Sequence, residues 1–151
     1  MNGKNLHVRI VSSLEKGLVG DPVEKYPELK KISVLTGEKL SFQLFIKTDR
    51  TEGNVSTRLF TFRVEGAEMT AREVRQVYDD LPKYHCDGSD RDGLFIYSAS
   101  GMYPDVLEPT DCDRIRPAED VLTAIWFDGR FSEPGRRTVT VRLSENGSEI
   151  A

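Results

Sequence analysis

The chain has 151 residues, of which 38% are hydrophobic and 30% are charged, and its formal net charge is −4. This length suits one domain with a buried core, and this composition argues against a chain that is disordered throughout. The two signs of charge are interspersed without a basic stripe, which argues against nucleic acid or an anionic membrane as a partner. No apolar run reaches the roughly 18–20 residues that a membrane span requires.

The first residues and the cysteines indicate the cellular compartment. The N-terminal stretch MNGKNLHVRIVSS has a lone lysine and no apolar core of the kind found in signal peptides. Two cysteines, Cys86 and Cys112, are too few for a disulfide framework. We therefore expect a cytoplasmic protein with reduced thiols, in which Cys86 and Cys112 pair only if the fold brings them together.

The first third of the chain predicts three strands and a loop. LHVRIVS (6–12) and KKISVL (30–35) are short runs that favour strands, and the Gly-, Pro- and charge-rich segment 14–29 between them indicates a surface loop. A turn at Thr36-Gly37-Glu38 then leads into LSFQLFIK (40–47). There Leu40, Phe42, Leu44 and Ile46 share one face, Ser41, Gln43 and Lys47 share the other, and Phe45 interrupts the polar face.

The middle of the chain predicts further strands and two irregular segments. RLFTFRV (58–64) alternates as a strand does, whereas REVRQVY (72–78) fits a strand and also has helix-compatible spacing. KYHCDGSDRDG (83–93) indicates a loop, and GLFIY (93–97) is a short candidate strand. The segment SASGMYPDVLEP (98–109) fits neither a strand nor a helix, and we expect a rigid loop there.

The last third predicts two strands joined by a turn. VLTAIWF (121–127) and RTVTVRL (137–143) are strand-like, and Glu133-Pro134-Gly135-Arg136 between them is typical of a type II turn. The final residues, SENGSEIA, form a turn with nothing expected to pack behind it. About eight short strands separated by turns predict an all-β fold, and we favour an antiparallel two-sheet β-sandwich with long loops and little helix over a barrel. One such domain spans residues 1–151.

Residues with reactive side chains do not form a recognisable catalytic or metal-binding pattern. His85-Cys86-Asp87, with Asp90 and Asp92, lacks the ligand spacing of zinc or EF-hand calcium sites, so we expect no metal and no cofactor. The adjacent Glu119 and Asp120 precede a strand and indicate a charged lead-in rather than a glycosidase pair. His7 lies in a predicted strand and indicates a core-edge or surface position. We therefore expect no catalytic residue in this chain.

Three aromatic residues are candidates for ligand or partner contacts. Trp126 alternates with Ile125 and Phe127, so either Trp126 or its neighbours face outward. An exposed tryptophan can stack on a sugar ring or anchor a partner domain, and a core position is the alternative. Tyr97 and Tyr103 present the same choice.

Three segments follow one another in an order found in a known family. They are ELKKISVLTGEKLSFQLFIK (28–47), MYPDVLEP (102–109) and AIWFDGRFSEPGRRTVTVRL (124–143), with SSLEK (12–16) ahead of them. In this order they resemble the N-terminal β-sandwich domain of glycoside hydrolase family 123 and its relatives of unknown function, over roughly residues 8–143. The chain departs from the family at Val106, where proline tends to recur, and at Arg136 and Arg137, where small or aromatic residues are usual.

The resemblance implies a place in a longer, glycoside hydrolase-like protein. Family members put such a domain ahead of a (β/α)-barrel that carries catalysis with an adjacent Asp-Glu pair, and no catalytic residue carries over to this chain. We therefore expect a non-catalytic accessory domain that supports or docks the C-terminal barrel of the same polypeptide, which acts on glycans. Pro104 and Asp105 would hold Tyr103 as a fixed platform, either for this docking or for packing onto the sandwich.

Two other functions remain as alternatives. The chain could be a stand-alone carbohydrate-binding module that binds glycan through Trp126, Tyr97 and Tyr103. It could also be a protein-interaction sandwich of the immunoglobulin or fibronectin type. The third function ranks last, because Trp126 follows both cysteines instead of lying between them.

Overall fold

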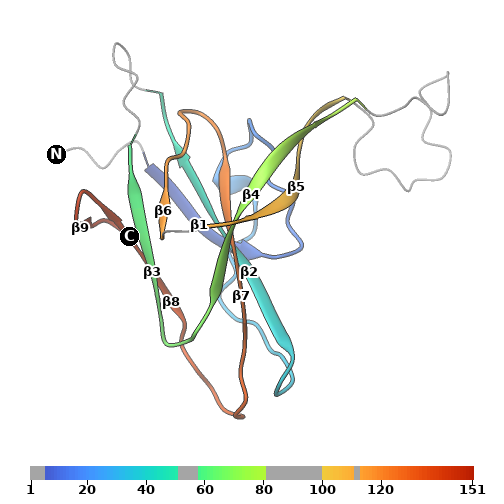
Figure 1. Ribbon diagram of the computed structural model, residues 1–151, viewed down its shortest axis with the longest axis vertical. Coiled ribbons are helices and arrows are strands. Elements are labelled where there is room, and N and C mark those ends of the chain that lie inside the picture. The colour runs from blue at the N-terminus through green and yellow to red at the C-terminus, as the bar shows by residue number, and fades with distance from the viewer. Residues whose placement is uncertain (1–5, 51–57, 81–99, 111–112) are drawn as a thin grey trace, which may run out of the picture.

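In the computed structural model, the described residues are 6–50, 58–80, 100–110 and 113–151, and they form two antiparallel sheets (Figure 1). The five-stranded sheet has the order β1-β2-β7-β4-β5, with the bounds Leu6–Ser12, Lys39–Thr48, Thr123–Arg130, Thr70–Asp79 and Gly101–Pro109. The four-stranded sheet has the order β6-β3-β8-β9, with the bounds Arg114–Ile115, Phe60–Glu65, Thr140–Glu145 and Ser148–Glu149. Helix is limited, within these described ranges, to the short 3-10 turn η1 (Val23–Lys25). The predicted all-β sandwich is confirmed.

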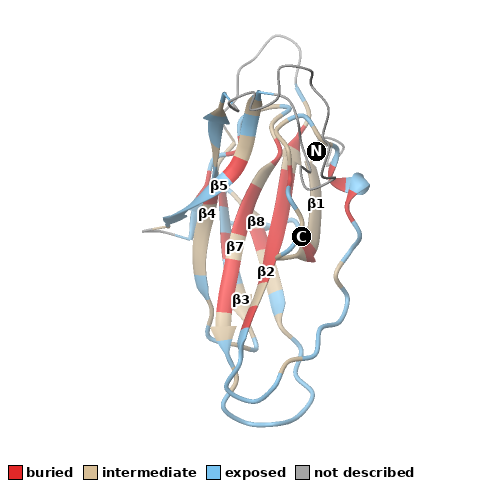
Figure 2. Ribbon diagram, turned by 90° about the vertical axis from the view of Figure 1, so that its right-hand side faces the viewer, coloured by how far each residue is buried: buried red, intermediate tan, exposed pale blue. Residues whose placement is uncertain are grey.

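The main core lies between the two sheets. Alternate residues of β2 and β7 point inward, and Phe42, Phe127 and Phe62 form an aromatic group at the centre. The Phe127 ring stacks on Phe42 with centroids 5.3 Å apart and meets Phe62 edge-on at 5.6 Å. Figure 2 shows that burial is concentrated along β2 and β7, the central part of the sandwich. Burial of aromatic side chains supplies most of the hydrophobic stabilisation of such a core.

A second apolar cluster lies on the opposite, outer face of the five-stranded sheet. Phe45 is fully buried there, in edge-on contact with Tyr26 at a centroid distance of 4.9 Å. Val23 and Tyr26 come from the segment 14–29, which is a loop between strands as predicted, but which packs these two side chains against the sheet. The segment folds over the sheet because Phe45, together with Leu122 and Ala124, gives this face an apolar patch that needs a cover. Phe45 therefore interrupts the polar alternation for a structural reason.

The predicted strand at 30–35 is also wrong. This segment pairs with none of the described strands, and the exposed fractions of Ile32 and Leu35 are 45% and 78%. The turn that follows is confirmed, since Glu38 N–H donates to the Leu35 carbonyl at 3.0 Å and Gly37 has a φ of +82°. Alternation of apolar residues favours an extended segment, but a strand also needs a neighbouring strand for its backbone hydrogen bonds, and the described residues provide none for 30–35.

The C-terminal strands differ in extent from the prediction. Gly135 has a positive φ, but β8 begins at Thr140, so residues 137–139 lie outside it. The chain end is paired rather than unpacked: Asn146 and Gly147 turn into β9, and Ile150 N–H donates to the Leu143 carbonyl at 2.9 Å. The two positive φ angles suit the hairpin turn that the sequence Asn-Gly favours.

The segment predicted as a rigid loop at 98–109 is a strand along most of its length. Residues 101–109 form β5, which pairs with β4 along eight residue pairs. The ambiguous segment 72–78 is accordingly a strand, because β4 lies between β7 and β5 in the sheet. The predicted strand 93–97 lies outside the described residues.

Candidate functional site

The hairpin formed by β4 and β5 contains the Tyr103-Pro104-Asp105 segment. Pro104 pairs with Gln76 and Val106 pairs with Arg75, so Asp105 is the extra residue of a β-bulge. Proline cannot donate to the ladder of hydrogen bonds, and bulges accommodate such positions. Tyr103 is half-buried, Pro104 is buried and Asp105 is exposed. The three residues therefore share a kinked edge strand, not a loop.

The same hairpin exposes an unusual number of apolar side chains. Among the described residues, nine large hydrophobic side chains are exposed, and five of them lie on β4 or β5. The five are Val77 (40% exposed), Tyr78 (63%), Met102 (42%), Val106 (46%) and Leu107 (40%), and we call them the hairpin patch. In Figure 1 this hairpin extends to the upper right, away from the four-stranded sheet. The register of the two strands places Val77 and Val106 on one face of the hairpin and Tyr78, Met102 and Leu107 on the other. Exposed apolar residues in this number mark an interaction surface, and a partner that covered them would contact both faces of the hairpin.

Three charged groups beside the hairpin patch are paired with one another. Arg75 binds Glu108 across the two strands and lies 3.7 Å from the Glu73 carboxylate. The hydrogen bond to Glu108 is the main reason that the pKa of Arg75 lies above its usual value. Arg75, Glu73 and Glu108 therefore satisfy one another, and a partner would meet the apolar side chains of the hairpin patch together with the exposed Asp105.

The β5 edge is poorly suited to the addition of another strand. β5 is the last strand of its sheet, and the bulge at Asp105 kinks it. Pro104 and Pro109 have no N–H to offer an incoming strand. A partner would consequently contact this hairpin through side chains.

Trp126 lies on the outer face of β7 and is half-buried. It is opposite Gln43 of β2 and Arg72 of β4, and it packs against the outer apolar cluster. Gln43 is itself buried, and its Nε2 donates to the carbonyls of Ser12, Ser13 and Glu15 at 3.2, 3.3 and 2.9 Å. One side of the Trp126 side chain therefore packs against the rest of the domain.

A paired carboxylate lies two residues beyond Trp126 on the same face. Asp128 is 7% exposed; it lies 2.7 Å from Lys39 Nζ and also binds Arg72. Burial alone would raise the pKa of Asp128, but the hydrogen bonds from Lys39 and Arg72 outweigh burial, so this pKa lies below its usual value. The adjoining polar cavity of about 460 Å³ is lined by Lys39, Glu68, Met69, Thr70, Asp128, Gly129 and Arg130. Asp128 is held ionised and paired, which does not suit a general acid.

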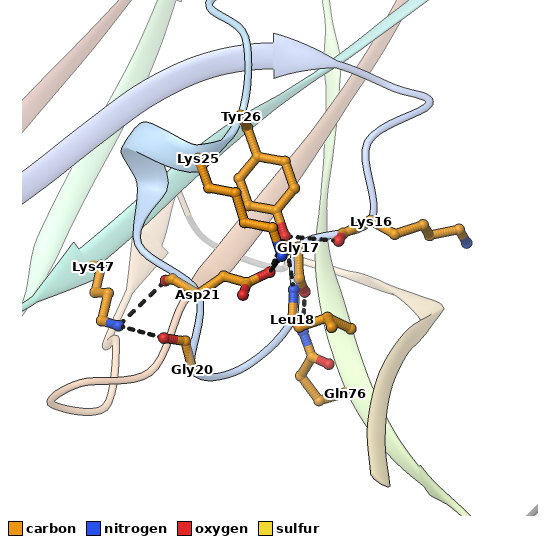
Figure 3. Close-up of polar contacts among 9 residues, drawn as sticks. All are labelled: Lys16, Gly17, Leu18, Gly20, Asp21, Lys25, Tyr26, Lys47 and Gln76. Atoms are coloured by element: carbon orange, nitrogen blue, oxygen red, sulfur yellow. Dashed lines mark hydrogen bonds and ion pairs between the residues drawn. The ribbon is translucent and has the colours of Figure 1, made fainter. Parts of the chain in front are cut away.

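The segment over the outer face is tied down by polar contacts that connect it to the hairpin (Figure 3). The Tyr26 hydroxyl accepts from Leu18 N–H at 3.2 Å, lies 2.9 Å from the Lys16 carbonyl and contacts the Asp21 carboxylate. Gln76 of β4 donates to the Gly17 carbonyl at 2.9 Å. The segment 14–29 is therefore connected to β4 of the hairpin by the hydrogen bond between Gln76 and Gly17.

We expect Tyr26→Phe to lower the free energy of unfolding by about 1–2 kcal/mol, because it removes the part-buried hydroxyl and its hydrogen bonds to Leu18, Lys16 and Asp21. Urea unfolding followed by circular dichroism measures the change. Tyr78→Phe, at a hydroxyl on a 63% exposed side chain, is the matched control and should leave stability unchanged. Equal effects of the two substitutions would contradict the role of the Tyr26 hydroxyl.

His7 links two elements that are distant in sequence. Its Nδ1 lies 2.8 Å from Glu24 and its Nε2 lies 3.2 Å from Asp49. The hydrogen bond with Glu24, and after it that with Asp49, raises the pKa of His7 above 6.5. His7 therefore lies at a partly exposed position, as predicted, and its ring contacts two carboxylates.

The pairing of His7 predicts a pH-dependent contribution to stability. A raised pKa in the folded state gives stabilisation that is complete below pH 6.5 and is lost as pH rises through the raised value. Because the His7 side chain is 36% exposed, the contribution should stay below about 1 kcal/mol. Unfolding of the wild type and His7→Gln, compared on the acidic and alkaline sides of this pKa, should show a difference only on the acidic side. A pH-independent difference would rule out the ionic contribution.

The remaining candidates from the sequence are placed as follows. Glu119 forms an isolated bridge with Thr48, and Asp120 accepts from Arg50 N–H at 3.2 Å, so both act in the lead-in to β7. Tyr97, His85, Cys86, Cys112, Asp90 and Asp92 lie outside the described residues. Within the described ranges, no group of three or more metal-ligating side chains is found, and no helix is long and apolar enough to span a membrane.

Comparison with known proteins finds a likeness among solved structures. No family model matches the chain, and no curated protein matches its sequence. Among solved structures, part of a family 123 glycoside hydrolase from Clostridium perfringens, studied for glycolipid glycan hydrolysis, is similar to this chain with a TM-score of 0.61 and 11% identity. The likeness covers 97% of this chain and 25% of that enzyme, so the chain spans about a quarter of its length. At this identity the comparison shows a shared fold.

Proposed function

We propose that this chain is a non-catalytic accessory domain of a family 123-like glycoside hydrolase, and that its hairpin patch docks the catalytic (β/α)-barrel of the same polypeptide. The observation that carries the proposal is the concentration of exposed apolar side chains on β4 and β5. The likeness to one quarter of a family 123 enzyme supports the accessory role, because the rest of such a protein would lie outside this fold. A cytoplasmic location is part of the same proposal.

The chemistry of the described residues supports the absence of a catalytic role. The buried carboxylate of Asp128 is neutralised by Lys39 and Arg72, whereas glycoside hydrolysis requires one carboxyl that is protonated in the resting enzyme. We expect the purified chain to hydrolyse no member of a panel of aryl glycosides, amino sugars included. Turnover that co-purifies with the chain and is lost in Asp128→Asn would contradict the non-catalytic role.

Docking is tested by substitution in the longer polypeptide that the proposal predicts. Val77→Ser, Val106→Ser and Leu107→Ser together should leave the isolated domain folded, since all three side chains are exposed, but should lower the unfolding temperature of the joined barrel. Leu14→Ser, at an 87% exposed apolar position away from the hairpin, is the control and should have no such effect. A reading frame without a barrel, or equal effects of the hairpin and control variants, would reject the proposal.

Glycan binding at Trp126 is the second candidate, favoured by the half-buried indole on the same strand face as Asp128, which lines the polar cavity. Because Trp126 is the single tryptophan of the sequence, its fluorescence reports directly on this face. A saturable shift on titration with amino-sugar oligosaccharides would support this function. An unchanged spectrum at millimolar oligosaccharide would remove it.

A further inference from the structure

Two segments that belong to no strand form a groove on one side of the sandwich. It has a volume of about 670 Å³ and lies between residues 29–36 and 131–139. Apolar side chains from β1, β2 and β8 also line it, namely Ile10, Leu40, Phe42 and Val141. The groove is separate from the hairpin patch, with which it shares no residue.

The backbone of both walls lacks partners within the described part of the chain. Residues 30–34 and 132–139 make no backbone hydrogen bond to any described residue. The groove is bounded by hydrogen bonds from Leu29 N–H to the Ile10 carbonyl and from Gly37 N–H to the Phe131 carbonyl, both 2.8 Å long. Between these points the walls offer C=O groups and, except at Pro134, N–H groups that pair with no other described backbone group, as the edges of a sheet do.

The charges on the two walls are unbalanced. Lys30 lies 3.2 Å from Glu28, and Arg137 donates to Glu133 at 2.9 Å. Lys31 and Arg136 line the groove from opposite walls and have no ion pair with another described residue. The groove therefore combines an apolar lining with two uncompensated positive charges, although the chain as a whole is acidic.

We propose that this groove binds an extended peptide segment of a partner, in which apolar side chains alternate with acidic ones. In an extended segment, successive side chains point to opposite sides, so the apolar ones meet the lining while the carboxylates reach Lys31 and Arg136. The peptide backbone hydrogen-bonds to the walls, as in other cases of strand addition. This inference does not depend on the accessory role or on the hairpin patch.

Two synthetic peptides of about eight residues, the length of an ordinary strand, test the proposal. One alternates valine with glutamate and the other alternates valine with lysine. Titrated into the isotope-labelled chain, the glutamate peptide should shift the amide resonances of residues 30–36 and 133–139 and should bind at least about tenfold more tightly than the lysine peptide.

Charge reversal gives the sharper test. The double variant Lys31→Glu/Arg136→Glu should prefer the lysine peptide, because the charges of the walls are inverted while the apolar lining is retained. Arg63→Glu, at a side chain that is 80% exposed on β3 and outside the groove, is the control and should keep the wild-type preference. The proposal is overturned if neither peptide shifts these resonances at millimolar concentration, if the two peptides bind equally, or if the double variant keeps the original preference.

Discussion

Phe127→Ala is expected to lower the free energy of unfolding by about 3–5 kcal/mol, the largest single effect that we anticipate in this domain. Phe127 is fully buried and contacts Phe42 from β2 and Phe62 from β3, so it joins the two sheets. Alanine removes these contacts and leaves a cavity that two rigid sheets cannot easily collapse around.

Denaturant unfolding measures this effect, and Leu14→Ala provides the control. The Leu14 side chain is 87% exposed, so its truncation should change the free energy of unfolding by less than about 0.5 kcal/mol. A comparable loss in the two variants would mean that the sheets do not pack through Phe127.

Gly17→Ala is the second substitution with a large expected effect. A methyl group at this position would lie 2.6 Å from Leu122 Cδ2 and 2.9 Å from Phe45 Cζ, and both of these side chains are fully buried. The segment over the outer face would have to lift from the sheet, which also strains the bond from Gln76 to the Gly17 carbonyl. We expect a loss of about 2–3 kcal/mol, in the upper part of the range for overpacked cores.

Gly20→Ala is a matched control for this test, because a methyl group there would meet no atom within 4 Å. The two glycines belong to the same segment, so general effects of glycine on the unfolded chain are similar for both. Thermal unfolding should separate them clearly. Indistinguishable unfolding temperatures would show that the segment does not pack against Phe45 and Leu122.

Short-range patterns in the sequence predicted the sandwich itself. Strands β1, β2 and β3 begin within two residues of the predicted positions, because the alternation of inward and outward side chains is a local property of an extended chain. Turn chemistry was equally local at Gly37, whose φ of +82° suits its turn. Gly135 has a positive φ of +136°, but among the described backbone groups Arg136 makes no hydrogen bond to Glu133 of the kind that closes a type II turn.

Features that depend on distant partners were not predicted. The burial of Tyr26 depends on Phe45, and the strand at Tyr103 depends on pairing with Val77, neither of which periodicity in one segment can reveal. Proline at position 104 favoured a loop, whereas the structure accommodates it with a bulge at an edge. The apolar residues near Pro104, namely Met102, Val106 and Leu107, were the feature of the sequence from which the hairpin patch could have been predicted.

Hydrogen exchange of the backbone amides tests the docking of the hairpin most directly. Exchange is compared, residue by residue, between the isolated domain and the longer polypeptide that includes the barrel. The account predicts slower exchange in the longer protein along β4 and β5, with the greatest protection between Gly101 and Pro109 and with β1 and β3 unchanged. Identical exchange of this hairpin in the two proteins would contradict it.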